Sequence, residues 1–132
     1  KKPIKKTTKK LDATVLLVDD SSIHNMALKE FLGFRINQCI TAESAEEAYS
    51  TIESHAVDCI VLDMYLPDAD GKEVIQRLKE NEDYKDIPVI IYSGKSLTAV
   101  EESQLNEYAH AIVQKNVKSY SLLLENILNI VG

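Results

Sequence analysis

Polar side chains follow four of the short apolar runs in this sequence, each close to the end of its run. They are Asp19 and Asp20 after the first run, Asp63 after the third, Ser93 after the fourth and Lys115 after the fifth. Three carboxylates that share one pocket repel one another unless a cation is present. Oxygen ligands on short loops suit Mg²⁺ better than zinc or a full calcium cage. A hydroxyl and an ammonium at the same place favour an anion beside the metal, and phosphate is the obvious one.

Each of these residues has an ordinary explanation when it is taken alone. Asp20, for example, begins the sequence Asp20-Ser21-Ser22, which is a good start for a helix. Acidic residues after strands are also common in solvated loops. Helix caps and solvated loops are a much poorer explanation for polar residues at the ends of four apolar runs, so the combined pattern favours one binding site.

Five apolar runs alternate with segments of helical periodicity. The runs cover residues 14–18, 37–41, 57–62, 88–92 and 111–113. Four of them are rich in Val and Ile and nearly continuous, which is typical of strands buried on both faces of a parallel sheet. The pattern predicts an α/β fold of (βα)₅ order, a three-layer sandwich with helices on both faces of the sheet. In such a sheet ligands bind beyond the carboxyl ends of the strands, so the polar run ends would meet at one edge.

The helical segments are recognised by apolar residues three and four positions apart. These residues are Ile23, Ala27 and Phe31 in the first segment, Ala45, Ala48, Tyr49 and Ile52 in the second, Val74, Ile75 and Leu78 in the third, and Leu123, Leu124, Ile127, Leu128 and Val131 in the last. Helix starts are predicted by capping-box spacing. The spaced pairs are Ser44 with Glu47, Asp70 with Glu73, and Thr98 with Glu101. The segment over residues 98–108 has few apolar residues, so we expect it to pack shallowly.

The 132-residue chain is acidic, and its charge is unevenly distributed. Residues 1–10 hold six of the 15 basic residues and no acid, so nine basic residues face 21 acids over residues 11–132, a net charge of −12. A body this acidic repels nucleic-acid phosphates, and we expect no direct nucleic-acid binding. We interpret residues 1–12 as a lysine-rich linker or tether and residues 13–132 as one domain; the alternative for the lysines is an arm for a membrane surface or nucleic acid.

Several other classes of protein are excluded by composition. A hydrophobic content of 45% argues against disorder. No apolar run is long enough to span a bilayer, and the start of the chain lacks the pattern of a signal peptide. Cys39 and Cys59 lie in apolar runs without metal-binding spacing, so we interpret them as reduced core residues of a cytoplasmic protein.

Four motifs together resemble the receiver domain of two-component response regulators, the CheY-like family. They are VLLVDDS, IVLDMYLPDADG, VIIYSGK and AIVQKN, and the resemblance covers residues 13 to about 131. Each motif is weak alone, but all four in this order on the expected strands are highly specific. The resemblance implies the flavodoxin-like fold with the strand order 2-1-3-4-5.

The resemblance also implies a set of roles for the polar residues. Asp63 would accept a phosphoryl group from a phosphohistidine of a histidine kinase or a histidine phosphotransfer domain. The implied ligands of Mg²⁺ are Asp20, Asp63 and the backbone carbonyl of Tyr65, with Asp19 bound to the metal or just outside its ligands. Ser93 would hydrogen-bond one phosphoryl oxygen and Lys115 would pair with another, since transfer requires the charge on these oxygens to be neutralised. Such a domain catalyses its own phosphorylation and dephosphorylation and is not a conventional turnover enzyme.

Three positions depart from the usual pattern of the family. Ser93 stands where threonine is commoner, Asn116 follows Lys115 where proline is usual, and Ile112 stands where an aromatic residue usually swings inward with the hydroxyl. Asn116 predicts either a looser loop or an unusual trans form. With Ile112 we expect damped switching or output through another surface.

Two further residues are expected to affect the lifetime of the phosphoryl group. Tyr65 and Lys95 lie two positions after Asp63 and Ser93, where side chains in this family influence hydrolysis. Tyr65 would shield the acyl phosphate from water, or it is an ordinary exposed loop tyrosine.

Two alternatives remain beside a phosphorylatable receiver. A pseudo-receiver that only docks partners is favoured by Ile112 and Asn116, although the otherwise complete set of polar residues argues against it. A dehalogenase-type phosphatase needs a second acid two residues after the nucleophile, but Tyr65 stands at that position.

The lysine-rich start and the missing Met favour a chain that is the C-terminal part of a larger protein, such as a hybrid histidine kinase, over a stand-alone regulator. A homodimer would use the face of the fourth helix, the fifth strand and the fifth helix.

Overall fold

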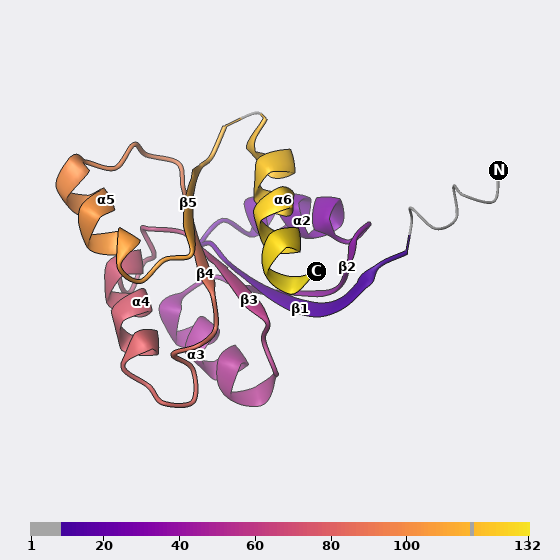
Figure 1. Ribbon diagram of the computed structural model, residues 1–132, viewed down its shortest axis with the longest axis horizontal. Helices are drawn as coiled ribbons and strands as arrows, with labels where there is room; N and C mark the ends of the chain where they lie inside the picture. Colours follow the sequence, from indigo (N-terminus) through magenta and orange to yellow (C-terminus); the bar gives the residue numbers. More distant parts are fainter. Residues whose placement is uncertain (1–8, 117) are drawn as a thin grey trace.

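A parallel sheet of five strands forms the middle layer of the computed structural model, which describes residues 9–116 and 118–132 (Figure 1). The strands are β1 (Leu11–Val18), β2 (Ile36–Ala42), β3 (Cys59–Leu62), β4 (Val89–Ser93) and β5 (Ala111–Gln114). They lie in the order β2-β1-β3-β4-β5, and all neighbouring pairs are parallel. The predicted flavodoxin-like α/β fold is therefore confirmed.

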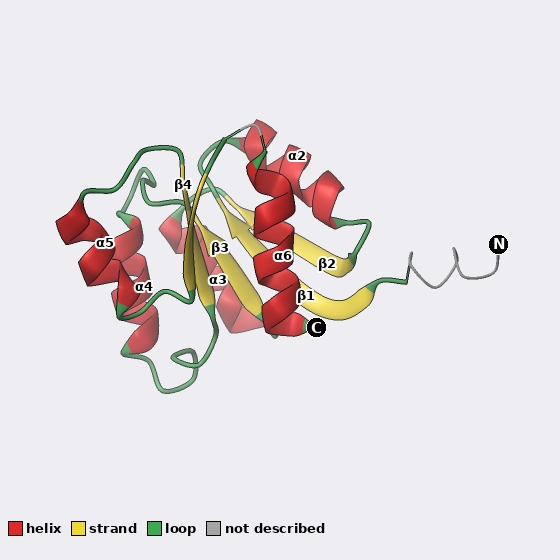
Figure 2. Cartoon of the chain, turned by 45° about the horizontal axis from the view of Figure 1, so that its top comes forward, coloured by secondary structure: helices red, strands yellow, loops and turns green. Residues whose placement is uncertain are grey.

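Five helices cover the two faces of the sheet (Figure 2). Helices α2 (Ser22–Leu32) and α6 (Ser119–Val131) cover one face, and α3 (Ala45–Ser54), α4 (Gly71–Lys79) and α5 (Ala99–Asn106) cover the other. The alternation of side chains along a strand divides the core between these faces. On β1, Val15 and Leu17 pack toward α2 and α6, whereas Leu16 and Val18 pack toward α3 and α4.

The predicted capping residues begin their helices. Asp70 and Thr98 form complete capping boxes with Glu73 and Glu101 at the starts of α4 and α5. Ser44 caps α3 by accepting a hydrogen bond from the Glu47 N–H, but the Glu47 carboxylate binds the N–H of Glu43 and not that of Ser44. Leu105 is the buried residue of α5, which agrees with the shallow packing expected of this helix.

Helix α2 turns a different face toward the sheet from the one that its apolar spacing predicts. Its buried residues are Asn25, Leu28 and Leu32, whereas the predicted Ile23 and Ala27 are exposed; the predicted Phe31 is half-buried and packs against the core. The reason is Asn25, whose amide donates to the backbone carbonyls of Asp19 at 2.9 Å and Ala42 at 3.2 Å. A polar residue thus occupies a core position, and Ile23 is left 75% exposed.

Both cysteines are buried and unpaired, as expected. Burial raises the pKa of the Cys59 thiol to about 12, which leaves it as an unreactive core residue. Among the described helices none is both long and apolar enough to cross a membrane. Most of the predicted lysine-rich tether, residues 1–8, lies outside the described residues, and β1 begins at Leu11.

Candidate functional site

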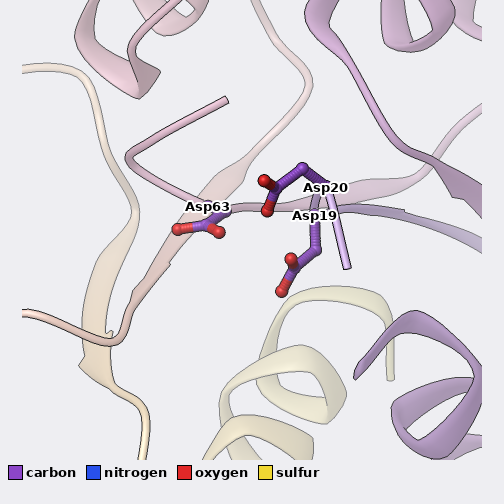
Figure 3. Close-up of side chains that lie close together, drawn as sticks. All are labelled: Asp19, Asp20 and Asp63. Carbon is purple, nitrogen blue, oxygen red and sulfur yellow. The ribbon is translucent and has the colours of Figure 1, made fainter. Parts of the chain in front are cut away.

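Three carboxylates meet where β1 and β3 end (Figure 3). Asp19 and Asp20 follow β1, and Asp63 follows β3. The Asp63 N–H donates to the Val18 carbonyl at 2.9 Å, so the ladder between the two strands continues beyond their ends and holds Asp63 beside the acidic pair. One oxygen of each carboxylate lies within 4.8 Å of the others. Asp19 is buried, Asp63 is half-buried and Asp20 is exposed.

The ammonium of Lys115 compensates two of these negative charges. Its Nζ donates to Asp19 at 2.6 Å and to Asp63 at 3.4 Å. Burial alone would lower the pKa of Lys115, but the hydrogen bond to Asp19 and the charge of Asp63 outweigh burial and hold the pKa above its usual value. The lysine is therefore a fixed positive charge at neutral pH.

Asp63 remains electrostatically strained in spite of this ion pair. Burial raises its pKa; the charge of Lys115 opposes that rise, and the nearby charge of Asp19 adds to it. The net direction is upward, mainly because of burial, so the ionised form of Asp63 is disfavoured. Three carboxylates face one ammonium, and a divalent cation bound here would balance the remaining charge.

The two aspartates after β1 differ in how the protein uses them. One oxygen of Asp19 accepts from the Ser21 N–H at 2.9 Å, the other binds Lys115, and His24 Nδ1 lies 3.7 Å from Asp19. Ser21, and not Asp20, caps the start of α2, so a capping role does not account for Asp20. Figure 3 shows Asp20 reaching from the end of β1 to the side of Asp63.

The hydroxyl of Ser93 lies at the same edge but faces its own loop. Ser93 is 1% exposed, and its Oγ donates to the Lys95 carbonyl at 3.0 Å and accepts from the Lys95 N–H at 3.3 Å. Its hydrogen bonds within the described chain thus run to the backbone of Lys95. To meet a ligand in the pocket, the hydroxyl has to leave this turn.

Tyr65 and Lys95, which follow Asp63 and Ser93 by two residues, contact each other. The Lys95 Nζ lies 5.2 Å from the centroid of the Tyr65 ring, which is within the range of a cation–π contact. Tyr65 is 42% exposed, and its N–H lies 3.5 Å from an oxygen of Asp63. Gly71 closes this loop against α4, where a Cβ would lie 3.0 Å from the Cα of Met64 and 3.1 Å from the Asp63 carbonyl.

A cavity of about 400 Å³ extends from the carboxylates to the region between α2 and α6. Its lining includes Asp19, Asp63 and Lys115 together with the aromatic residues Tyr92 and Tyr120. Tyr92 was not found from the sequence because it closes an apolar run. A buried tyrosine needs a hydrogen-bond partner for its hydroxyl, and that requirement was the only available signal.

The two remaining departures from the expected motifs are placed as follows. Ile112 is half-buried, pairs with Ile91 in β4 and packs on the side of α3, α4 and α5. The peptide bond between Lys115 and Asn116 is trans, and so are the other peptide bonds in the described parts of the chain. The N–H and carbonyl of Asn116 both bind the side chain of Ser119.

Known signalling proteins match this chain in sequence. The family model described as the response regulator receiver domain matches residues 15–126. The phosphate regulon transcriptional regulatory protein PhoB of Pseudomonas aeruginosa is 34% identical over 82 residues, which cover 62% of this chain and 36% of that protein. The gliding motility regulatory protein of Myxococcus xanthus is 33% identical over 116 residues, which cover 86% of this chain and 14% of that protein.

A solved structure matches over nearly the whole chain. The response regulator protein TrrA from Thermotoga maritima, in complex with Mg(2+)-BeF, has a TM-score of 0.74 and 25% identity, and the match covers 89% of this chain and 98% of that chain. In contrast, the chain spans 36% and 14% of the length of the two curated relatives.

Proposed function

Because this chain belongs to the response regulator receiver domain family, we propose that it accepts a phosphoryl group on Asp63 in a two-component phosphorelay. One observation carries the proposal: three carboxylates lie together, and a half-buried ammonium pairs with two of them, with Lys115 Nζ 2.6 Å from Asp19 and 3.4 Å from Asp63. A carboxylate nucleophile, a cation site and a fixed positive charge are the groups that phosphoryl transfer requires.

In the proposed reaction an oxygen of Asp63 attacks the phosphorus of a phosphohistidine on a histidine kinase or a histidine phosphotransfer domain. A P–O bond forms as the P–N bond breaks, and the imidazole leaves with the electron pair and takes a proton from water. The product is an acyl phosphate on Asp63. Attack by water later releases inorganic phosphate and regenerates the carboxylate.

Lys115 and Ser93 would stabilise the charge on the phosphoryl oxygens. Lys115 already lies between Asp19 and Asp63, so a short movement of its ammonium would pair it with a phosphoryl oxygen. Ser93 would donate to a second oxygen once its hydroxyl leaves the Lys95 carbonyl. We propose that this exchange of hydrogen-bond partners starts the conformational switch by moving the β4–α5 loop. Such a movement does not require an aromatic residue at position 112.

The carboxylates fit Mg²⁺, a hard cation that prefers oxygen ligands and keeps several waters. Asp20 and Asp63, two of the clustered carboxylates, would bind the ion, and the family resemblance adds the backbone carbonyl of Tyr65. Asp19 would bind the ion or lie just outside its ligands; its two oxygens already accept from the Ser21 N–H and the Lys115 ammonium. When bound, Mg²⁺ neutralises charge on the transferring phosphoryl group. The complex of TrrA with Mg(2+)-BeF supports the choice of Mg²⁺ as the cation.

The test is phosphorylation by a small donor. We expect acetyl phosphate with Mg²⁺ to add about 80 Da to the intact protein, the mass of one phosphoryl group, and Asp63→Asn to remove this species. Chelation of the metal should prevent it as well.

A wild-type protein that gains no mass, or an Asp63→Asn variant that still gains it, would contradict the proposal. The first outcome favours the alternative, a docking module that does not depend on phosphorylation. Two observations would agree with such a docking module. Ile112 stands at the position where the family usually has an aromatic residue, and the Ser93 hydroxyl is bound to the backbone of its own loop.

Removal of the Tyr65 ring should shorten the lifetime of the acyl phosphate. The ring lies beside the Lys95 ammonium, two residues after Asp63, and would exclude water from phosphorus. We expect Tyr65→Ala to lose the phosphoryl group about threefold faster, the rate equivalent of one exposed cation–π contact, whereas Tyr65→Phe should match the wild type. The decay of the phosphorylated mass after removal of the donor measures both rates. Equal rates for Tyr65→Ala and the wild type would show that Tyr65 is an ordinary loop residue.

The surroundings of the domain are also part of the proposal. We propose a cytoplasmic location, which the free thiols of Cys39 and Cys59 support. A homodimer would use the face of α5, β5 and α6, where Val100 and Leu122 are exposed. Direct nucleic-acid binding is not expected of so acidic a body.

A further inference from the structure

Tyr92 touches two different parts of the candidate site. It precedes Ser93 on β4, packs on the side of α2 and α6, and is 5% exposed. Its hydroxyl lies 2.5 Å from the Ser119 hydroxyl at the start of α6. The centroid of its ring lies 5.5 Å from the Nζ of Lys115. None of the roles proposed above uses either contact.

The hydrogen bonds around Ser119 fix the direction of its bond to Tyr92. The Ser119 hydroxyl donates to the Asn116 carbonyl at 2.9 Å and accepts from the Asn116 N–H at 3.1 Å. A hydroxyl has one hydrogen and two acceptor sites, so the Tyr92 phenol donates to the site that remains. Burial raises the pKa of Tyr92 above its usual value, and the phenol therefore keeps this hydrogen at neutral pH.

These bonds fix the backbone on both sides of Lys115. On the strand side, the Lys115 N–H donates to the Ser93 carbonyl at 2.7 Å. On the helix side, both polar backbone groups of Asn116 are bound to Ser119, which Tyr92 holds in turn. The turn thus has a side-chain anchor at a position where the family usually has proline.

We propose that Tyr92 is a positioning residue for Lys115, holding the turn through Ser119 and facing the ammonium with its ring. The inference rests on the proposed function, in which Lys115 pairs with a phosphoryl oxygen. Lysine carries its charge on a flexible four-carbon stem. A fixed backbone and an aromatic face beside the ammonium reduce the positions that the charge can sample. Tyr92 does not contact the phosphoryl group and acts only through Lys115.

The experiment compares the effect of Tyr92→Phe in two backgrounds, the wild type and Lys115→Ala. The rate of phosphorylation by acetyl phosphate is measured from intact mass at saturating Mg²⁺. In the wild-type background we expect Tyr92→Phe to slow the reaction about fivefold, the equivalent of one hydrogen bond. In the Lys115→Ala background we expect less than about a twofold change, because residues that act through one another are not additive. Ser119→Ala should behave like Tyr92→Phe in both backgrounds.

Tyr108→Phe is the matched control, since it removes a tyrosine hydroxyl on the other face of the sheet. It should leave the rate unchanged, and Tyr92→Phe, Ser119→Ala and Tyr108→Phe should all keep the wild-type affinity for Mg²⁺ within about twofold. Unchanged rates in Tyr92→Phe and Ser119→Ala would overturn the inference. So would a fivefold effect that persists in the Lys115→Ala background, or a loss of Mg²⁺ affinity equal to the loss of rate. A wild-type protein that is not phosphorylated at all would contradict the proposed function itself, and the inference with it.

Discussion

Mg²⁺ at about tenfold its dissociation constant is expected to raise the free energy of unfolding by about 1.4 kcal/mol, and Asp20→Ala to abolish this rise. The reason lies in the pocket, where Asp19, Asp20 and Asp63 place one oxygen each within 4.8 Å of the others. Lys115 compensates this charge only in part, since the pKa of Asp63 stays above its usual value. A cation that binds the folded state and not the unfolded chain stabilises the fold by mass action.

Thermal unfolding with and without MgCl₂ measures the effect, which should be about 4 °C for a domain of this size. Ionic strength is matched with KCl, so that general screening of charge is excluded. Asp83→Ala serves as the control, because Asp83 is an exposed aspartate in the loop before β4 and should keep the full response. An Asp20→Ala variant that still responds to Mg²⁺ would show that the ion binds elsewhere.

The stabilisation by Mg²⁺ should also weaken as the pH falls. Burial raises the pKa of Asp63, so its carboxyl group takes up a proton at a higher pH than an ordinary aspartate does. Because a metal ligand must be deprotonated, the stabilisation by Mg²⁺ should fade as the pH falls through this raised value.

Lys115→Ala is expected to slow phosphorylation about 100-fold, which is the usual effect of removing one group that stabilises charge in the transition state. It should also destabilise the metal-free protein, because Asp19 and Asp63 lose their partner in a pocket where their side chains are only 11% and 12% exposed. We expect a loss of about 2 kcal/mol, below the cost of breaking a fully buried pair because water reaches part of the site.

Denaturant unfolding and the phosphorylation assay measure these two effects separately. Saturating Mg²⁺ should remove much of the stability loss but little of the rate loss, since the cation restores positive charge to the pocket but does not replace the ammonium at its position. Lys85→Ala is the matched control, because it breaks an exposed ion pair with Glu82 and should cost less than about 0.5 kcal/mol. A Lys115→Ala variant that is phosphorylated at the wild-type rate would exclude the proposed role of Lys115.

The location of the site was predictable from the sequence, because parallel strands bring their carboxyl ends to one edge. Asp19, Asp20, Asp63 and Lys115 meet there as expected, held by backbone ladders that continue beyond the strands. Their roles in chemistry stay predictions. What the sequence could indicate was thus which residues share an edge, and not which hydrogen bonds they form.

The details that could not be predicted depend on contacts between distant segments. Asn25 occupies a core position of α2 because its amide reaches two backbone carbonyls at the ends of β1 and β2, and no periodicity of apolar residues contains that information. Tyr92 and Ser119 lie 27 positions apart, and their pairing follows only from the packing of α6 against β4. Ser93 was expected to face a ligand, yet a turn of its own loop satisfies its hydroxyl.

The two hydrogen bonds of Asn25 have a consequence for preorganisation of the pocket. They fasten α2 to the ends of both β1 and β2, directly beside the loop that carries Asp19 and Asp20. That loop cannot rearrange without separating a helix from two strands, so its conformational entropy is lost when the chain folds and not when an ion arrives. The position of the backbone that carries Asp19 and Asp20 is therefore a property of the folded framework, and an ion meets this backbone already in place.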